Sequence, residues 1–170
     1  MISVVIDFID KFIQEKKPTG KVIDIGGRDV NGSPKQLFIN QGLSYDCLDL
    51  ASGQNVNIVM NAEDIKAKLA PESYDVVCCL ETLEHVKKPW VIVDNCKYLL
   101  KKGGWLIITV PSINHPKHEW PGDYYRYFET TLREVFFEGY EGVVTWEGVW
   151  GETASEIKPD AVLGYGRKPL

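Results

Sequence analysis

Two acidic residues end short apolar segments of the chain, where their carboxylates are placed to bind hydroxyl groups. Asp24 stands directly before the Gly26-Gly27 turn, and Asp49 closes the next apolar segment, followed by Leu50. Glycines at such a turn let a ligand approach the backbone closely, and an acid at the second position can accept both hydroxyls of a ribose. The pattern predicts a site for a ribose-containing ligand, with binding favoured over a simple turn role for both acids.

Polar residues continue this pattern at the ends of three later apolar segments. Asn61, Ala62 and Glu63 follow the third segment, close to where an adenine would lie, and Glu81 follows the fourth. Asn and the acids are also common turn and capping residues, so both roles stay open for Glu63 and Glu81. Thr109 lies at the end of the fifth segment. Ligands of open α/β sheets bind outside the carboxyl ends of the strands, where all these residues would meet.

The loop 111–130 carries the residues best suited to handle a second substrate. It holds His115, His118 and several tyrosines, and histidine has the unperturbed pKa that suits a base near neutral pH. An apolar pocket with a few polar groups is the usual small-ligand site, so we expect an acceptor pocket here with one of these histidines as catalytic base. A solvated or hydrogen-bonded role is the alternative for each histidine, and packing on the sheet edge is the alternative for the tyrosines.

The same loop contains two further combinations of polar side chains. His115 and His118 with Glu119 or Asp123 would supply metal ligands. Loop histidines without a defined helix spacing are poor evidence for a metal, and we predict no metal site. Asp123 and Arg126 are expected to pair with each other or with Glu81 or Glu84, which follow the fourth segment.

Apolar segments alternate with helical patterns along the chain. Apolar runs predict buried strands, which we place at 21–25, 44–50, 56–61, 74–80, 105–110, 143–149 and 161–165. Helical spacing and caps predict helices, at 1–19, from Ser33 to about Gly42, at 62–70, at 89–100 and from the capping box Thr131–Glu134 onward. This order predicts one α/β domain over 1–170, a doubly wound, mostly parallel seven-stranded sheet with helices on both faces. The last two strands have no helix between them, so we expect an antiparallel hairpin.

Taken together, these motifs resemble the class I S-adenosylmethionine-dependent methyltransferases, from about Lys21 to the C-terminus. The resemblance rests on VIDIGG, CLDL, NAED, SYDVVCCLETLEHVKKPW and LLKKGGWLIITVPS. It is specific in the combination of an aromatic-Asp-Val-Val strand, the following Leu-Glu-His, and Leu-Leu-Lys-x-Gly-Gly before the fifth strand. The chain is most similar to the small-molecule branch called type 11 methyltransferases.

This resemblance implies a Rossmann-like fold with S-adenosylmethionine as cofactor. It assigns cofactor contacts to the strand-end residues: the methionine part to Asp24 and Gly26, the ribose to Asp49, the adenine to Asn61 and Ala62, the sulfonium side to Glu81, with Gly27, Leu50 and Glu63 beside them. The chain departs from the family in the glycine-rich turn, where Arg28 and Val30 occupy positions that usually carry glycine. The turn must therefore take a different path.

The resemblance also implies methyl transfer, and the loop 111–130 is similar to loops of methyltransferases found with sugar and polysaccharide genes. We therefore expect a small-molecule or glycan acceptor that is methylated at a hydroxyl. One alternative is an interaction module that binds the cofactor without catalysis. Another is a nicotinamide-dependent oxidoreductase, which would need a G-x-G-x-x-G turn that Gly26–Gly32 does not supply. A DNA amino-methyltransferase would carry Asn/Asp-Pro-Pro-aromatic after the fourth strand, where this chain has Cys-Leu-Glu-Thr.

Composition limits the partners and the compartment. The net charge of −5 argues against duplex nucleic acid, whose binding depends on basic side chains that face phosphates. The four cysteines form no C-x-x-C pair, and Cys78 and Cys79 lie inside an apolar run, as buried cysteines of reducing compartments do. The N-terminus lacks signal-peptide features, and no apolar run approaches membrane-spanning length. We expect a cytoplasmic protein without membrane contact.

Overall fold

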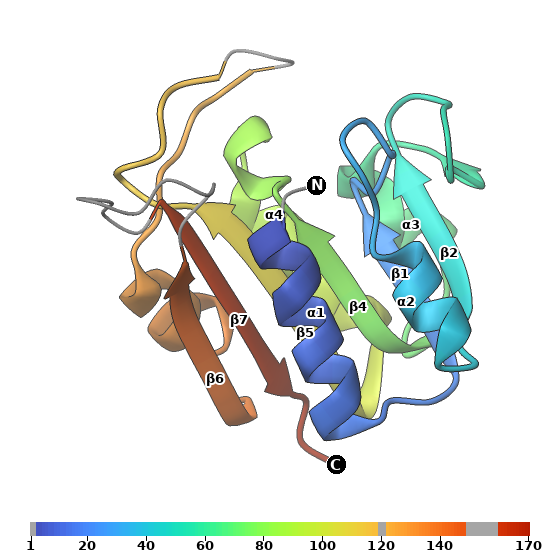
Figure 1. Cartoon of the computed structure of the whole chain (residues 1–170). Helices are drawn as coiled ribbons and strands as arrows, with labels where there is room; N and C mark the ends of the chain where they lie inside the picture. The colour runs from blue at the N-terminus through green and yellow to red at the C-terminus, as the bar shows by residue number, and fades with distance from the viewer. Residues whose placement is uncertain (1–2, 119–121, 149–159) are drawn as a thin grey trace.

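The computed structural model describes residues 3–118, 122–148 and 160–170. Its centre is a seven-stranded sheet with the order β3-β2-β1-β4-β5-β7-β6 (Figure 1). Strands from β3 to β5 are parallel to their neighbours, and β7 is antiparallel to β5 and β6. The strands are β1 (Lys21–Ile25), β2 (Ser44–Asp49), β3 (Ile58–Val59), β4 (Tyr74–Leu80), β5 (Leu100–Pro111), β6 (Glu141–Gly148) and β7 (Ala161–Arg167). The predicted doubly wound sheet with its C-terminal antiparallel pair is confirmed.

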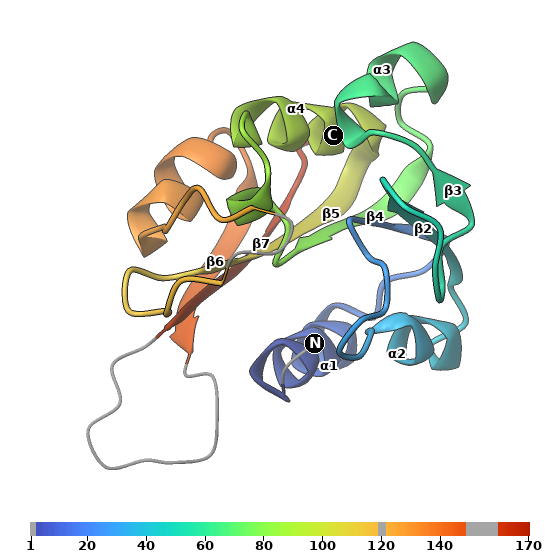
Figure 2. The same ribbon diagram turned by 90° about the horizontal axis from the view of Figure 1, so that it is seen from above.

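Helices cover both faces of the sheet, as predicted (Figure 2). One face carries α1 (Ser3–Lys16) and α2 (Lys35–Asn40), and the other carries α3 (Ile65–Lys68), α4 (Pro89–Leu99) and the π-helix η3 (Thr131–Phe136). Two short 3-10 turns, η1 (Ala62–Asp64) and η2 (Leu83–His85), follow β3 and β4. Within the described ranges, no helix has both the length and the apolar character needed to cross a membrane.

Apolar side chains at helical spacing bury α1 against the sheet. Val5, Ile9 and Phe12 are fully inaccessible to solvent, which is the stripe expected of a helix that packs on a core. The Phe12 ring lies 5.7 Å from the Trp105 ring of β5 and 5.1 Å from the Tyr165 ring of β7. The helix therefore holds β5 and β7 together and fixes the strand from which the loop 112–128 leaves.

The central strand β4 is apolar on both faces. Val77 and Cys79 lie in the core on the α4 side, and Val76, Cys78 and Leu80 lie in the core on the α1 side, as the alternation of a strand requires. All four cysteines are free and buried. This agrees with the interpretation of Cys78 and Cys79 as small buried hydrophobic residues.

Two strands differ in length from the sequence prediction. β3 has only two residues, because the Cys47 amide donates to the Asn57 side-chain oxygen at 2.7 Å and not to a backbone carbonyl of a longer β3. β5 begins at Leu100, and Lys101–Gly104 form a bulge in it, where an exit turn was expected. Two backbone hydrogen bonds with Lys168 hold this bulge: the Gly103 amide donates to the Lys168 carbonyl, and the Lys168 amide donates to the Gly104 carbonyl, both at 2.9 Å. Positions 1–2 of the predicted first helix, 119–121 of the loop and Val149 of the sixth strand lie outside the described residues.

The predicted start of the last helix near Thr131 agrees with η3, but the predicted Thr131–Glu134 capping box does not form. A capping residue has extended backbone, whereas Glu129 and Thr130 are already helical and the Thr131 amide donates to the Phe128 carbonyl at 2.9 Å. Thr130 makes no side-chain cap. The helical turn is therefore closed before Thr131, and this residue lies inside it.

The connections out of β1 and β4 diverge at the middle of the sheet. β2 and β3 lie on one side of β1, whereas β4 and β5 lie on the other. Such a switch point leaves room for a ligand outside the carboxyl ends of the two strands. In Figure 1 the loops after β1, β2, β4 and β5 leave the sheet at this same end.

Gly26 is expected to tolerate a side chain less well than another glycine with the same backbone angle. Its φ is +77°, and an added Cβ would lie 2.4 Å from Thr82 Oγ1, whereas Gly139 has the same φ and open space. The backbone strain of about 1–3 kcal/mol applies to both, so Gly26→Ala should lower the free energy of unfolding more than Gly139→Ala. Chemical denaturation measures both, and equal losses would contradict close packing of Gly26 on Thr82.

Candidate active site

Asp24 is buried beneath the turn that follows β1. Its side chain is inaccessible to solvent, the Tyr45 hydroxyl donates to Oδ2 at 2.7 Å, and Oδ1 has no hydrogen-bond partner among the described residues. Burial raises the pKa of Asp24 to about 7, against the lowering effect of the Tyr45 hydrogen bond, and the charge of Asp49 raises it further. A buried polar atom without a partner costs free energy, so a ligand that satisfies Oδ1 gains from this arrangement.

Gly26 and Gly27 bring the chain close to Asp24. A Cβ at Gly27 would lie 2.4 Å from Asp24 Oδ2. Both glycine amides approach the Leu48 carbonyl of β2, at 2.7 and 3.4 Å. The turn is therefore held against β2 with its backbone exposed for close approach by a ligand.

Asp29 supports the turn where this chain lacks the family's later glycines. Its Oδ1 accepts from the Gly32 amide at 2.8 Å, and its own amide donates to the Gln54 carbonyl at 3.2 Å. Arg28 lies across Gly53, where a Cβ would be 2.7 Å from Arg28 Cδ. The altered path expected from Arg28 and Val30 is thus held by contacts with the segment after β2.

Asp49 is the last residue of β2 and lies beside the glycine turn. Strand register pairs Ile25 with Leu48, so Gly26 and Asp49 are neighbours at the ends of adjacent strands. The Asp49 side chain is half-buried, and its Oδ1 accepts from the Ala51 amide at 3.0 Å. This bond fixes the carboxylate at the strand end, while the following Leu50 is 73% exposed.

Asn61 has a local structural role at the end of β3. Its Oδ1 accepts from the Glu63 amide at 3.0 Å and caps η1. Asn95 of α4 donates to the Ala62 carbonyl at 2.7 Å and anchors the turn. Glu63 is exposed and Ala62 half-buried. Any contact of these residues with an adenine is additional to this capping.

Glu81 follows β4 in an unusual backbone conformation. Its φ of +49° lies in the left-handed region, which costs a non-glycine residue about 1–3 kcal/mol and is common at functional sites. Both carboxylate oxygens are buried without a hydrogen-bond partner in the described part of the chain. Burial raises the pKa of Glu81 to about 7, while the Thr109 side chain lowers it. A strained, desolvated acid at a switch point is typical of a binding site.

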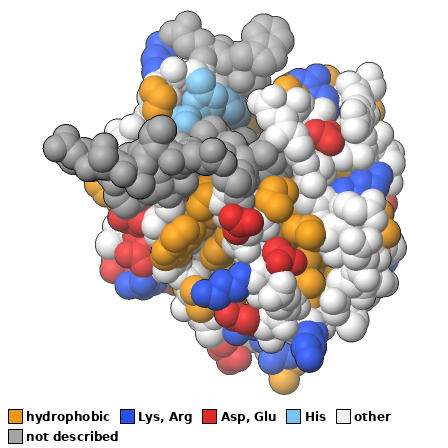
Figure 3. Space-filling view, viewed as in Figure 1, with side chains coloured by type: hydrophobic (Ala, Val, Ile, Leu, Met, Phe, Trp, Pro, Cys, Tyr) orange, Lys and Arg blue, Asp and Glu red, His pale blue; other side chains and the backbone are white. Residues whose placement is uncertain are grey.

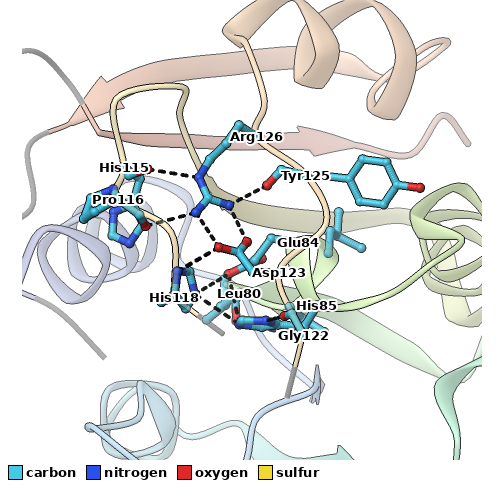
Figure 4. A network of polar contacts seen from close by, with 12 residues as sticks. Leu80, Glu84, His85, His115, Pro116, His118, Gly122, Asp123, Tyr125 and Arg126 are labelled. Atoms are coloured by element: carbon cyan, nitrogen blue, oxygen red, sulfur yellow. Dashed lines mark hydrogen bonds and ion pairs between the residues drawn. The ribbon is translucent and has the colours of Figure 1, made fainter. Parts of the chain in front are cut away.

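Arg126 and Asp123 pair with each other, one of the outcomes predicted, and shape the loop after β5 (Figure 4). Arg126 donates to both carboxylate oxygens of Asp123, with Nη2 at 2.6 Å from Oδ2. It also donates to the carbonyls of His115 and Pro116 at 3.1 and 3.0 Å, and Asp123 accepts from the His118 amide at 2.8 Å. The pair joins the two arms of the loop, and it holds the pKa of Asp123 below its usual range.

Two tyrosines fasten this loop to the segment after β4. The Tyr127 hydroxyl donates to the Leu83 carbonyl at 3.0 Å, and the Tyr125 hydroxyl donates to the Lys87 carbonyl at 2.9 Å. The packing role is therefore observed for both, whereas the Tyr124 side chain is 50% exposed. These bonds place the histidines of the loop beside η2.

The three histidines gather where the loop meets η2 (Figures 3 and 4). The His118 ring lies 4.9 Å from the His85 ring and 5.1 Å from the His115 ring. Glu84 is fully buried below them, with Oε1 3.4 Å from His85 Nε2 and 3.8 Å from His118 Nε2. Burial lowers the pKa of His85 and His115 and raises that of Glu84. Neutral imidazoles of this kind can accept a proton or bind a cation.

The sequence predictions singled out His115 and His118, considered Glu84 only as a pairing partner of Asp123 or Arg126, and assigned no role to His85. Glu84 and His85 both belong to the Leu-Glu-His that follows β4. The 3-10 turn η2 brings them under the loop. Their contact with His118 joins residues 33 positions apart in the chain, which no local sequence pattern signals.

Comparisons with known proteins agree with this arrangement. A family model described as a methyltransferase domain matches residues 1–138. The ubiquinone biosynthesis O-methyltransferase of Paraburkholderia phymatum is 37% identical over 111 residues, which cover 56% of this chain and 47% of that protein. The chain thus spans about half the length of this relative.

Solved structures share the fold at low sequence identity. An S-adenosylmethionine-dependent methyltransferase from Archaeoglobus fulgidus superposes with a TM-score of 0.70 at 15% identity, over 96% of this chain and 94% of that one. The 1,6-didemethyltoxoflavin-N1-methyltransferase of Burkholderia thailandensis gives 0.73 at 15%, over 97% and 78%. Because the family model covers most of its residues, this chain belongs to the family of S-adenosylmethionine-dependent methyltransferase domains.

Proposed function

We propose that this protein transfers a methyl group from S-adenosylmethionine to a hydroxyl of a small-molecule or glycan acceptor. The observation that carries the proposal is the row of acids at the carboxyl ends of the central strands. Asp24 lies under the glycine turn, Asp49 lies beside that turn, and Glu81 follows β4. The name of the 37% identical relative, an O-methyltransferase, supports oxygen as the accepting atom.

The residues at these strand ends fit the cofactor. Asp24 Oδ1 is buried without a partner in the described residues, and a side chain at Gly27 would collide with Oδ2 of the same carboxylate. We assign the methionine part to Asp24, Gly26 and Gly27, the ribose to Asp49 and Leu50, the adenine to Asn61, Ala62 and Glu63, and the sulfonium side to Glu81. When bound, S-adenosylmethionine supplies a methyl group activated by a positively charged sulfur. The carboxylates are placed to favour that positive charge.

The loop 112–128 is the proposed acceptor side. Displacement at a methyl group requires alignment of the acceptor and exclusion of water, and a hydroxyl acceptor must lose its proton as it attacks. We assign this proton to His115 or His118, which the Arg126–Asp123 pair holds in place. Burial keeps the pKa of His115 low, so that its imidazole is neutral and able to accept.

The proposal is tested by release of S-adenosylhomocysteine from S-adenosylmethionine with a panel of sugars, glycosides and phenols. At least one hydroxylated acceptor should give release that depends on both substrates, with the methyl group found on oxygen. Binding of the cofactor without turnover on any acceptor would favour the alternative of a non-catalytic module. Binding of NAD in its place would contradict the assignment of the site.

Asp49→Ala should weaken cofactor binding while it leaves the fold intact. Hydrogen bonds from a charged group are each worth about 1.5–3 kcal/mol, so the dissociation constant should rise roughly tenfold or more. Titration calorimetry measures this change. Asp94→Ala is the matched control, because Asp94 is an exposed acid on α4 paired with Lys66; its affinity should equal that of the wild type. Unchanged affinity for Asp49→Ala would contradict the ribose assignment.

His115→Ala and His118→Ala should leave cofactor affinity unchanged, because neither side chain is assigned to the cofactor. At least one of them should lower turnover by the ~10²–10⁴-fold typical of a lost acid-base group. Steady-state kinetics with the acceptor found above measures the loss. If both variants turn over like the wild type, neither histidine is the base, and the loop acts only by packing.

A further inference from the structure

Glu84, His85 and His118 bring three metal-ligating atoms together, and we call them the Glu-His-His cluster. Among the described residues their Oε1, Nε2 and Nε2 atoms all lie within 4.8 Å of one another. The separations are 3.3 Å between the two histidine nitrogens, 3.4 Å from Glu84 to His85, and 3.8 Å from Glu84 to His118. Two come from the turn after β4 and one from the loop after β5 (Figure 4).

These separations match the spacing of ligands around one small cation. Ligand atoms in a tetrahedral zinc site, with bonds of about 2.0–2.1 Å, lie about 3.3–3.4 Å apart. Two of the three separations already have this value, and the Glu84–His118 separation of 3.8 Å would have to shorten to about 3.4 Å. A tetrahedral ion therefore fits after a small movement of the Glu84 or His118 side chain.

The outer nitrogen of the His85 ring is hydrogen-bonded as in metal sites, and that of the His118 ring lies near a carboxylate. His85 Nδ1 is hydrogen-bonded to the Gly122 carbonyl, so Nδ1 carries the proton and Nε2 presents its lone pair. His118 Nδ1 lies 3.7 Å from Asp123 Oδ2, which also accepts from the His118 amide. Metal-binding histidines usually have a carbonyl or carboxylate partner at the ring nitrogen that faces away from the metal.

Glu84 lacks the compensation that a purely structural carboxylate needs. Its side chain is completely buried, and neither oxygen has a hydrogen-bond partner in the described ranges. Arg126, a nearby cation, already donates two hydrogen bonds to Asp123. A histidine-histidine hydrogen bond alone would leave this buried acid unsatisfied, which is costly, whereas a cation between the three groups satisfies it.

We propose that the Glu-His-His cluster binds one divalent transition-metal ion and leaves a coordination position open for an oxygen ligand. Two imidazoles and one carboxylate suit zinc and its first-row neighbours, whereas magnesium and calcium prefer all-oxygen sites. This proposal replaces the expectation of no metal, and its ligands share only His118 with the loop residues considered in the sequence.

The role of the ion in turnover rests on the proposed function. An acceptor hydroxyl in the open position would lose its proton more readily, as water does on zinc, and the proton would pass to His115 or to solvent. The oxygen lone pair then forms the bond to the methyl carbon, and the electrons of the carbon–sulfur bond return to sulfur. With His118 bound to the ion, His115 is the histidine left to act as base.

The binding test uses the full chain after removal of metals with a chelator. One equivalent of Co²⁺ should give the visible absorption bands of a low-coordinate site, and one equivalent of Zn²⁺ should displace it. Zn²⁺ should also raise the melting temperature, because binding to the folded state stabilises it, while Mg²⁺ at the same concentration should not.

His118→Ala and Glu84→Gln should each weaken Zn²⁺ binding more than about 100-fold, since loss of a residue that only hydrogen-bonds to a metal ligand already costs about 10–100-fold. His115→Ala is the matched control, a neighbouring histidine outside the cluster that should bind Zn²⁺ like the wild type. Glu84→Gln keeps the size of the side chain and removes its ionisable group, so its apo form should melt no lower than the wild type and the variant stays interpretable.

Binding that is absent, exceeds one ion per chain, or is equal in all variants would overturn the metal proposal. Cofactor binding and methyl transfer in the metal-free protein would still stand in that case. Conversely, one ion bound at the cluster without any turnover would leave the metal site in place and contradict the proposed function.

Discussion

A carboxyl group removed from water needs a compensating charge or hydrogen bonds, and three such groups meet at the carboxyl ends of β1 and β4. Asp24, Glu81 and Glu84 each have at least one buried oxygen without a hydrogen-bond partner in the described residues. Desolvation is the first cause of the raised pKa of all three, because burial penalises the charged form. The free protein therefore holds acids that gain from any ligand that brings positive charge. The sulfonium proposed beside Glu81 and the metal ion proposed beside Glu84 would both supply it.

The sheet makes this arrangement possible by supplying rigid neighbours on every side. Apolar side chains bury β4 from both faces, so its end cannot relax to hydrate Glu81. The Gly26-Gly27 turn packs against Asp24 and Thr82, where side chains would collide. On the other side, the Arg126–Asp123 pair and two tyrosine hydroxyls hold the loop after β5 over η2. Glu81 has a left-handed backbone that the strands around it keep in place.

The sequence allowed the fold to be predicted because apolar segments and helical patterns alternate clearly, and the strand order confirms that prediction. It missed features that depend on single contacts. Asn57 shortens β3 through a side-chain bond to Cys47, and Lys168 holds the Lys101–Gly104 bulge from a distant part of the chain. Local patterns carry no record of such partners. The strand-end acids were found because the topology alone places them, whereas the contact between His118 and the Glu84-His85 pair needed the path of a long loop.

The central claim is that the cofactor binds at the carboxyl ends of the central strands. The structure of the protein in complex with S-adenosylhomocysteine tests this claim most directly. The ribose hydroxyls should lie within hydrogen-bond distance of the Asp49 carboxylate, with the amino-acid part over the Gly26-Gly27 turn above Asp24. A ligand bound elsewhere on the sheet, or bound at the strand ends with Asp49 turned away from the ribose, would contradict the account.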